Sequence, residues 1–319
     1  MVEIPLVLTC DRKYLPYTTV CAVSAVRKTK RRILLYVLTD ESVTAKERKA
    51  FLETFAPFGN VKAEIIDVSG IAPFRDSAFP QFPKIVYYRF LIPQLLEGKN
   101  VEKCIYLDSD MTVLADIGEL FDTPLHGKLL GVCRDPVMAE QIGKQKKLPD
   151  GRTWLEYVQS IVKKPENYFV SACLVLNLKE IRARGQELWK KAMHMDGTNF
   201  YCPDQDILNM VFEDEVTFLP TAWCCSPPET EGASVPEAKI LHVKMWTTSL
   251  HPSDDIWFRD LKFTPYYYRV RAEYLALLFE RSVNNVLRPP RHGAVKSVLL
   301  FVWYFLAALA ARFSGRQKR

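Results

Sequence analysis

The sequence predicts an α/β protein built on a parallel sheet, and three observations lead to this fold class. Short apolar runs with the length of buried strands alternate with segments whose apolar residues recur at helical spacing. Aspartates follow the apolar runs where strands are expected to end, most clearly in residues 104–114, CIYLDSDMTVL. The composition, 48% hydrophobic and 25% charged over 319 residues, is that of a globular protein with a sizeable core.

Each expected strand is an apolar run that ends at a polar residue or a turn. Because strands and helices alternate, we expect parallel strands joined by right-handed crossovers. Residues 136–167 are polar and rich in Lys and Gln, so we expect a surface helix and a loop there, acting as a mobile lid. The expected strands are 4–10, 33–38, 61–68, 104–107, 129–133, 169–178, 215–219 and 239–243, and the expected helices are 17–29, 44–55, 84–96, 118–121, 180–195 and one from residue 202.

The chain is organised around Asp108 and Asp110, an acidic pair that follows a buried strand. Two carboxylates in such a place are costly to bury unless a cation compensates them. Mg²⁺ and Mn²⁺ prefer carboxylate oxygens, so we expect a divalent metal site that holds a phosphorylated ligand. Asp11 also follows a strand, and the ligands of parallel α/β sheets bind beyond these carboxyl ends.

Five further residues have side chains suited to such a site. His242 and Lys244 lie two residues apart, on one face of a strand, and we favour His242 as a third metal ligand over an ordinary polar residue. Arg89 is either a solvated residue of its helix or a cation that faces the phosphates. Asp204 and Asp206 suit the first turn of a helix as capping groups, although capping explains only one of the two.

Positive charge is concentrated at the carboxyl end of the chain. From Arg288 onward there are seven Lys or Arg and no acid, whereas 36 basic and 37 acidic residues precede it. The nearly neutral body argues against nucleic-acid binding. Residues 298–311 are an apolar run of about 21 Å as a helix, which is short of a bilayer core of roughly 30 Å. We expect a main domain at 1–285 and a tail at 286–319 that lies on an anionic membrane surface, with a docked helix or a short tilted span as alternatives.

Eight cysteines are scattered through the chain, most of them in apolar runs and none in a CxxC pair. This pattern is typical of reduced core cysteines in a cytosolic protein. The amino terminus has an acid at position three and only a short apolar run, which is unlike a signal peptide. We therefore expect a cytoplasmic protein, held at the inner face of the cell membrane by its tail.

In their order and spacing, three motifs resemble the retaining glycosyltransferases of family 8, which include bacterial lipopolysaccharide galactosyl- and glucosyltransferases and glycogenin. The motifs are YYRFLIP at 87–93, DSD at 108–110 and DQD at 204–206, and an aromatic stretch at 251–268 is also similar. The likeness covers residues 4–274. It implies a GT-A fold, with a Rossmann-like mixed sheet flanked by helices, that binds a UDP-sugar and Mn²⁺, with Mg²⁺ as the alternative ion.

The resemblance also implies roles for particular residues. Asp108, Asp110 and His242 match the metal ligands. The donor would be UDP-galactose or UDP-glucose, and the acceptor a glycan or glycolipid of lipopolysaccharide or the cell surface. Nucleotide-sugar positions are matched by Cys10, Asp11, Tyr14, Arg89, Ser109 and Lys244, and catalytic positions beside the sugar by Asp135, Asp204 and Gln205.

Two places depart from the family pattern. Val170, Ser171 and Ala172 stand where the family usually has Asn-Ala-Gly, so the Asn that approaches the sugar is missing. Lys244 follows His242 after a single residue, where the family has a longer loop before its phosphate-binding lysine. Either this loop is four residues shorter here, or Lys244 is not that lysine.

Two other functions compete with sugar transfer. Asp108 and Asp110 also fit the DxDxT loop of haloacid-dehalogenase-type phosphatases, in which the first Asp is the nucleophile. Those enzymes place the loop on their first strand, whereas about a hundred residues precede it here. The two departures favour the second competitor, a degenerate protein that binds nucleotide sugars without turnover.

Overall fold

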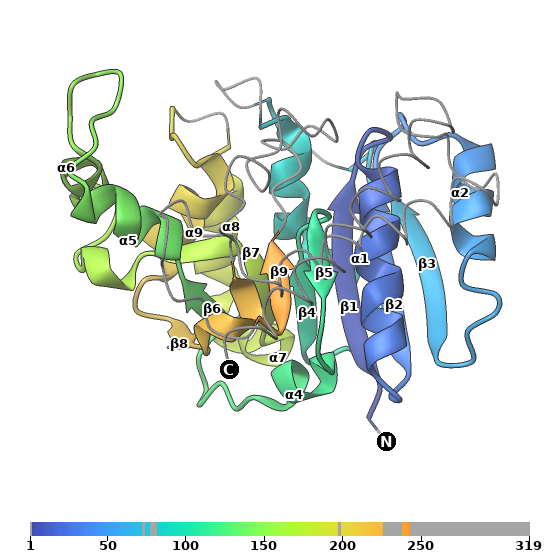
Figure 1. Cartoon of the computed structure of the whole chain (residues 1–319). Helices are drawn as coiled ribbons and strands as arrows, with labels where there is room; N and C mark the ends of the chain where they lie inside the picture. The colour runs from blue at the N-terminus through green and yellow to red at the C-terminus, as the bar shows by residue number, and fades with distance from the viewer. Residues whose placement is uncertain (1, 72–73, 77–81, 197–198, 226–237, 243–319) are drawn as a thin grey trace, which may run out of the picture.

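A computed structural model of the chain describes residues 2–71, 74–76, 82–196, 199–225 and 238–242 (Figure 1). A seven-stranded sheet forms its centre, in the order β3-β2-β1-β4-β7-β6-β8, and β5 and β9 form a separate two-stranded sheet. The strands are β1 (Ile4–Cys10), β2 (Ile33–Thr39), β3 (Val61–Asp67), β4 (Cys104–Leu107), β5 (Met111–Val113), β6 (Leu130–Arg134), β7 (Phe169–Leu176), β8 (Val216–Phe218) and β9 (Ile240–His242).

The strand directions show that the expectation of a fully parallel sheet is wrong. Strands β1, β2, β3 and β4 are parallel, but β7 runs antiparallel to both β4 and β6. The reason is the path of the chain. The last residue of β6, Arg134, is paired with the first residue of β7, Phe169, so β7 starts beside the end of β6 and runs back in the opposite direction. The mixed sheet is the one that a GT-A fold implies.

Helices cover both faces of the sheet, which explains the continuous apolar runs of its central strands. Alternate residues of β1 pack into two clusters: Leu6 and Leu8 lie in the cluster with α1, and Val7 lies in the other with Phe90 and Trp189. Figure 1 shows α1 lying along β1 and β2. The helices are α1 (Leu15–Lys28), α2 (Ala45–Glu53), α3 (Ile92–Leu95), α4 (Ile117–Asp122), α5 (Pro136–Gly143), α6 (Trp154–Gln159), α7 (Leu178–Glu180), α8 (Gln186–Met193) and α9 (Pro203–Phe212).

The segment expected as a helix at 84–96 is wound more tightly than an α-helix. Most of it is the 3₁₀ helix η1 (Lys84–Leu91), and only α3 continues it as α-helix. Pro93 has no N–H with which to bond the carbonyl of Arg89 in the α-helical pattern. That carbonyl accepts instead from the N–H of Ile92, in the 3₁₀ pattern.

The segment expected as one helix at 180–195 contains a π-helical turn, η3 (Ile181–Gly185), between α7 and α8. Gly185 ends this turn where the helix touches the sheet. A Cβ added there would lie 2.8 Å from Cδ1 of Leu129, so a larger residue at this position would require the side chain of Leu129 to shift. The remaining short helices are the 3₁₀ turns η2 (Pro165–Asn167) and η4 (Thr221–Cys224).

The polar segment at 136–167 forms surface helices, as expected, but it also has a small core of its own. Thr153 begins α6 with a capping box to Glu156, which fixes that helix locally. Its function as a lid stays a prediction. The buried members of this core are Met138, Leu148, Tyr157, Val158, Ile161, Val162 and Tyr168.

All eight cysteines are free and seven of them are buried, which confirms the expected core cysteines. Within the described part of the chain, no helix is both long enough and apolar enough to cross a membrane. Lys244, the aromatic stretch at 251–268 and the whole tail at 286–319 lie outside the described residues.

Candidate functional site

The structure brings Asp108, Asp110 and His242 together at the carboxyl end of β4. The strand ends at Leu107, and the acidic pair leads directly into β5. Antiparallel pairing of β5 with β9 sets His242 opposite Met111, beside Asp110. One ligand atom from each of the three side chains lies within 4.8 Å of the others, and His242 Nε2 is 3.2 Å from Asp110 Oδ1.

This cluster has the chemistry of a divalent metal site. Asp110 and His242 are buried and Asp108 is half-buried. Nδ1 of His242 is buried and has no hydrogen-bond partner among the residues that the structure describes. Carboxylate oxygens with one imidazole nitrogen are a donor set that suits Mn²⁺ and related ions. The three residues therefore fit the metal that the family resemblance implies.

Arg89 is a buried cation that joins the acidic pair to α9. Its Nη2 donates to Asp108 Oδ1 at 2.9 Å, and its Nη1 lies 3.1 Å from Asp204 Oδ2. It also donates to the carbonyls of Val86 and Ser171. Burial disfavours the charged form, but the carboxylates of Asp108 and Asp204 outweigh it and raise the pKa of Arg89. The alternative of a solvated helix residue is therefore wrong, since Arg89 is only 4% exposed.

Tyr106 also contributes to this site and was not predicted. Its hydroxyl donates to Asp108 Oδ1 at 2.7 Å and is bonded to Thr9 Oγ1 at 3.1 Å. Its ring centroid lies 4.5 Å from the guanidinium carbon of Arg89. The available signal was the spacing of two residues between Tyr106 and Asp108, which places both side chains on one side of an extended segment.

Two predicted nucleotide-sugar residues are occupied by contacts within the fold. The hydroxyl of Ser109 donates to the carbonyl of Thr9 at 2.6 Å and accepts from Thr18 Oγ1 at 2.8 Å, which ties the acidic turn to β1 and α1. Cys10 is fully buried, and burial raises the pKa of its thiol to about 12. Its backbone is therefore the part suited to a ligand.

Asp11 and Tyr14 lie at the start of α1, beyond the carboxyl end of β1. Asp11 Oδ1 accepts from the N–H of Tyr14 at 2.8 Å. Burial raises the pKa of both side chains, and the nearby carboxylate of Asp110 raises that of Tyr14 further. Strands β1 and β4 are paired and parallel, so their carboxyl ends lie side by side. Asp11 and Tyr14 therefore lie at the same end of the sheet as Asp108, Asp110 and His242, which we call the metal-type cluster.

Gln205 is held at both ends of its side-chain amide. Its Nε2 donates to Asp135 Oδ2 at 2.8 Å, and its Oε1 accepts from the N–H of Ser171 at 3.1 Å. The other oxygen of Asp135 caps α5 by accepting from the N–H groups of Val137 and Met138. The structure thus joins predicted catalytic residues from the end of β6 and the start of α9.

Asp204 and Asp206 are both buried. Asp206 has the predicted contact at the start of the helix, because its Oδ2 accepts from the N–H of Cys202, the N-cap residue of α9. Burial raises the pKa of Asp204, and Arg89 opposes that rise. Asp206 instead accepts hydrogen bonds from the hydroxyls of Tyr157 and Tyr168. No sequence pattern links these two tyrosines to Asp206, and the prediction missed both.

The departure at Val170, Ser171 and Ala172 lies inside β7. Ser171 uses its backbone here, since its carbonyl accepts from Arg89 and its N–H donates to Gln205. Any residue can make backbone contacts of this kind, so the departure leaves them intact. The question of the loop before Lys244 stays open, because Lys244 lies outside the described residues.

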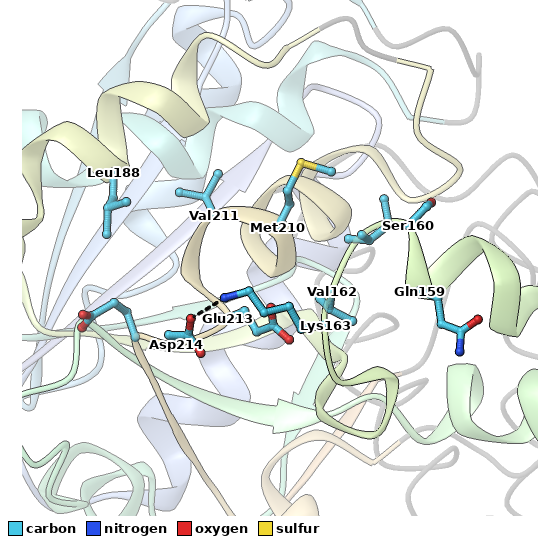
Figure 2. Close-up of a pocket in the computed structure, with 11 residues that line it drawn as sticks. Gln159, Ser160, Val162, Lys163, Leu188, Met210, Val211, Glu213 and Asp214 are labelled. Atoms are coloured by element: carbon cyan, nitrogen blue, oxygen red, sulfur yellow. Dashed lines mark hydrogen bonds and ion pairs between the residues drawn. The ribbon is translucent and has the colours of Figure 1, made fainter.

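A separate pocket of about 470 Å³ lies at the other end of α9 (Figure 2). An ion pair of 3.0 Å between Lys163 and Asp214 crosses it, and Leu188, Met210 and Val211 supply apolar lining. Asp204, Gln205 and Asp206 lie at the amino end of α9, and no residue of the candidate site lines this pocket, so the pocket is not part of the site.

A family model described as glycosyl transferase family 8 matches residues 5–248. The chain belongs to glycosyltransferase family 8. It is 25% identical over 199 residues to general stress protein A of Bacillus subtilis (strain 168), which covers 61% of this chain and 63% of that protein. It is 28% identical over 145 residues to lipopolysaccharide 1,2-glucosyltransferase of Escherichia coli (strain K12), which covers 43% and 37% of the two chains. The chain thus spans less than two thirds of the length of these relatives.

Solved structures support the fold of this family 8 member. A structure of the galactosyltransferase LgtC in complex with donor and acceptor sugar analogues superposes with a TM-score of 0.63 at 18% identity, covering 92% of this chain and 100% of that one. The GT-A fold is therefore confirmed. The family match and the place of the acidic pair after the fourth strand argue for glycosyl transfer and against the phosphatase alternative.

Proposed function

We propose that this family 8 member is a retaining hexosyltransferase. It would move galactose or glucose from a UDP-sugar to a saccharide acceptor of lipopolysaccharide or another cell-surface glycan. The observation that supports this most is the link from the metal-type cluster to Gln205, which runs from Asp108 through Arg89 to Asp204. The proposed diphosphate site and the proposed sugar site would thereby share one network of hydrogen bonds and ion pairs.

In this proposal Asp108, Asp110 and His242 hold Mn²⁺, with Mg²⁺ as the alternative ion. When bound, the ion offsets the negative charge that develops on the departing UDP. The charges of the described site favour a cation there, because Asp108 and Asp204 share the buried guanidinium of Arg89 and Asp110 adds a third carboxylate beside His242.

The side chains around Gln205 are proposed to face the sugar. Asp135 and Ser171 hold the amide of Gln205 in one orientation. In this proposal its carbonyl oxygen would therefore have a fixed position beside the reacting carbon. A neutral amide with both polar atoms already bonded is a weak nucleophile. This supports retention by front-face return of the acceptor over a covalent intermediate on Gln205.

The test is a screen of UDP-sugars with the full chain. We expect the protein to hydrolyse one UDP-hexose in the presence of Mn²⁺, and the same UDP-hexose to raise the melting temperature of the protein. With an acceptor, NMR should show a product in which the anomeric configuration of the donor sugar is retained. Mn²⁺-dependent UDP binding without turnover on any acceptor or on water would support the degenerate binding protein instead. Hydrolysis of phosphomonoesters with no need for a UDP-sugar would refute the transferase.

We also propose that the chain divides into a catalytic domain at 1–285 and a basic, apolar tail at 286–319 that meets an anionic membrane surface from the cytoplasmic side. Its seven basic residues and the run at 298–311 support this. A chain ending at Pro290 should lose sedimentation with vesicles that contain anionic lipid and keep its turnover. Unfolding of the shortened chain would show a docked helix.

A further inference from the structure

Asp206 is a fully buried carboxylate with a hydrogen-bond donor on each oxygen. Its exposed fraction is 0%. Oδ1 accepts from the hydroxyl of Tyr168 at 2.5 Å, and Oδ2 accepts from the hydroxyl of Tyr157 at 2.5 Å and from the N–H of Cys202 at 2.9 Å. A buried charge that has no cation among the described residues is expensive, so three donors on it call for an explanation.

The donors come from three separate parts of the chain. Tyr157 belongs to α6, Tyr168 precedes β7, and Cys202 precedes α9. The hydroxyl of Tyr157 also accepts from the N–H of Tyr201 at 2.9 Å, so the approach to α9 is bonded twice to α6. Asp206 therefore fastens the first turn of α9 to the segment at 136–167.

A second contact holds α9 one turn later. Asn209 Oδ1 accepts from the N–H of Phe169, and its Nδ2 donates to the carbonyls of Phe169 and Gln205. Two residues apart on a helix means about 200° of rotation, so Asp206 and Asp204 lie on opposite faces of α9. Gln205 lies between Asp204, fixed by Arg89, and Asp206, fixed by the tyrosines.

We propose that Asp206 is a positioning residue, which fixes Gln205 against Asp135 and Ser171 by fastening the amino end of α9 to Tyr157 and Tyr168. Its complete burial keeps it from touching a sugar. The consequence for catalysis rests on the proposed function, whereas the fixing of Gln205 does not.

A carboxylate suits this role better than an amide. Three donors converge on its two oxygens, and an asparagine would offer one oxygen and turn an NH₂ group toward the remaining donor. Asp206→Asn therefore loses at least one contact and keeps the size of the side chain. Tyr157→Phe and Tyr168→Phe each remove one hydroxyl and provide milder variants in case Asp206→Asn does not fold.

The first measurement is hydrogen exchange of the full-length protein, which needs no substrate. Peptides covering 199–205 and 169–172 should exchange about tenfold faster in Asp206→Asn, the effect of losing one hydrogen bond to a charged group. Peptides from β1 and β2 should not change. The matched control is Asp214→Asn, which removes an exposed carboxylate after the other end of the same helix.

The second measurement separates kcat from KM in the same variants. Because the metal-type cluster and Arg89 are untouched, the KM for the UDP-sugar and the activation by Mn²⁺ should stay within about twofold, while kcat falls about tenfold. Unchanged exchange at 169–172 and 199–205, or faster exchange over the whole chain, would overturn the inference that Asp206 fixes Gln205. Faster local exchange with unchanged kcat would overturn its consequence for catalysis. An inactive wild type would overturn only the proposed function, since the exchange result still decides whether Asp206 fixes Gln205.

Discussion

Two regions meet at the amino end of α9, and each buries an aspartate in a different way. On one side Asp204 shares the guanidinium of Arg89 with Asp108, so charge is compensated by charge. On the other side Asp206 is surrounded by neutral donors from Tyr157 and Tyr168. Burial raises the pKa of Asp206 to about 6, although hydrogen bonds from both tyrosines oppose the rise.

The difference teaches what each region is suited to do. The region around Arg89 keeps an excess of carboxylates over cations, so a bound cation would complete its balance of charge. The region around Asp206 also lacks a compensating cation among the described residues, but both oxygens of its carboxylate are already bonded to donors from the protein. We interpret the region around Arg89 as the side that binds the ligand, and the region around Asp206 as the side that keeps Gln205 in position.

The sharpest test of the binding side is Asp110→Asn. We expect turnover of the UDP-sugar to fall by on the order of a thousandfold, because one metal ligand and its charge are lost where the transition state needs them. Calorimetry should also show the loss of Mn²⁺-dependent UDP binding. The control is Asp122→Asn, an exposed carboxylate paired with Arg31, which should keep both. Undiminished turnover in Asp110→Asn would remove the metal from the proposal.

The next largest effect is expected from Arg89→Met. It leaves Asp108 and Asp204 buried without their cation, so the free energy of unfolding should fall by about 3 kcal/mol in urea denaturation. The matched variant Lys163→Met breaks an exposed ion pair with Asp214 and should cost less than about 1 kcal/mol. The double variant Arg89→Met, Asp204→Asn removes the buried charge of Asp204 as well. If it is no more stable than Arg89→Met alone, the guanidinium of Arg89 does not compensate the charge of Asp204.

The pH dependence of the free energy of unfolding tests the region around Asp206. The pKa of Asp206 is about 6 in the folded protein, against roughly 3.9 in an unfolded chain, so the folded state holds the proton more tightly. Its stabilising contribution is therefore fully present below about pH 4 and is lost as the pH rises through about 6. Relative to Asp206→Asn, the wild type should lose roughly 2 to 3 kcal/mol between pH 4 and pH 7. Urea denaturation across this range tests it, and a constant difference would contradict it.

The smallest effect compares two equivalent helix caps. Thr153 in α6 and Thr44 in α2 both form capping boxes, so replacing either by Ala should cost about 1 kcal/mol in unfolding free energy. Only α6 carries Tyr157, so Thr153→Ala should also lower kcat while Thr44→Ala should not. Equal kcat values in the two variants would show that α6 does not influence the site.

The elements near the amino terminus were well predicted from sequence. The strand β1 has its predicted ends, and β2 and β3 end within one residue of theirs. A strand buried on both faces is a continuous apolar run, so its ends are visible as changes of polarity. The direction of β7 was not predicted, because an apolar run reads the same in either direction.

The sequence by itself determined the order of the elements, the acidic pair Asp108 and Asp110, and the likeness to family 8. Only the tertiary structure decided which partner each buried carboxylate has. The hydroxyls on Asp206 come from 49 and 38 residues away, and the histidine beside Asp110 arrives through the pairing of β5 with β9. Spacing along the chain shows which side chains share a face, but the long-range packing decides whether an arginine or two tyrosines lie opposite that face.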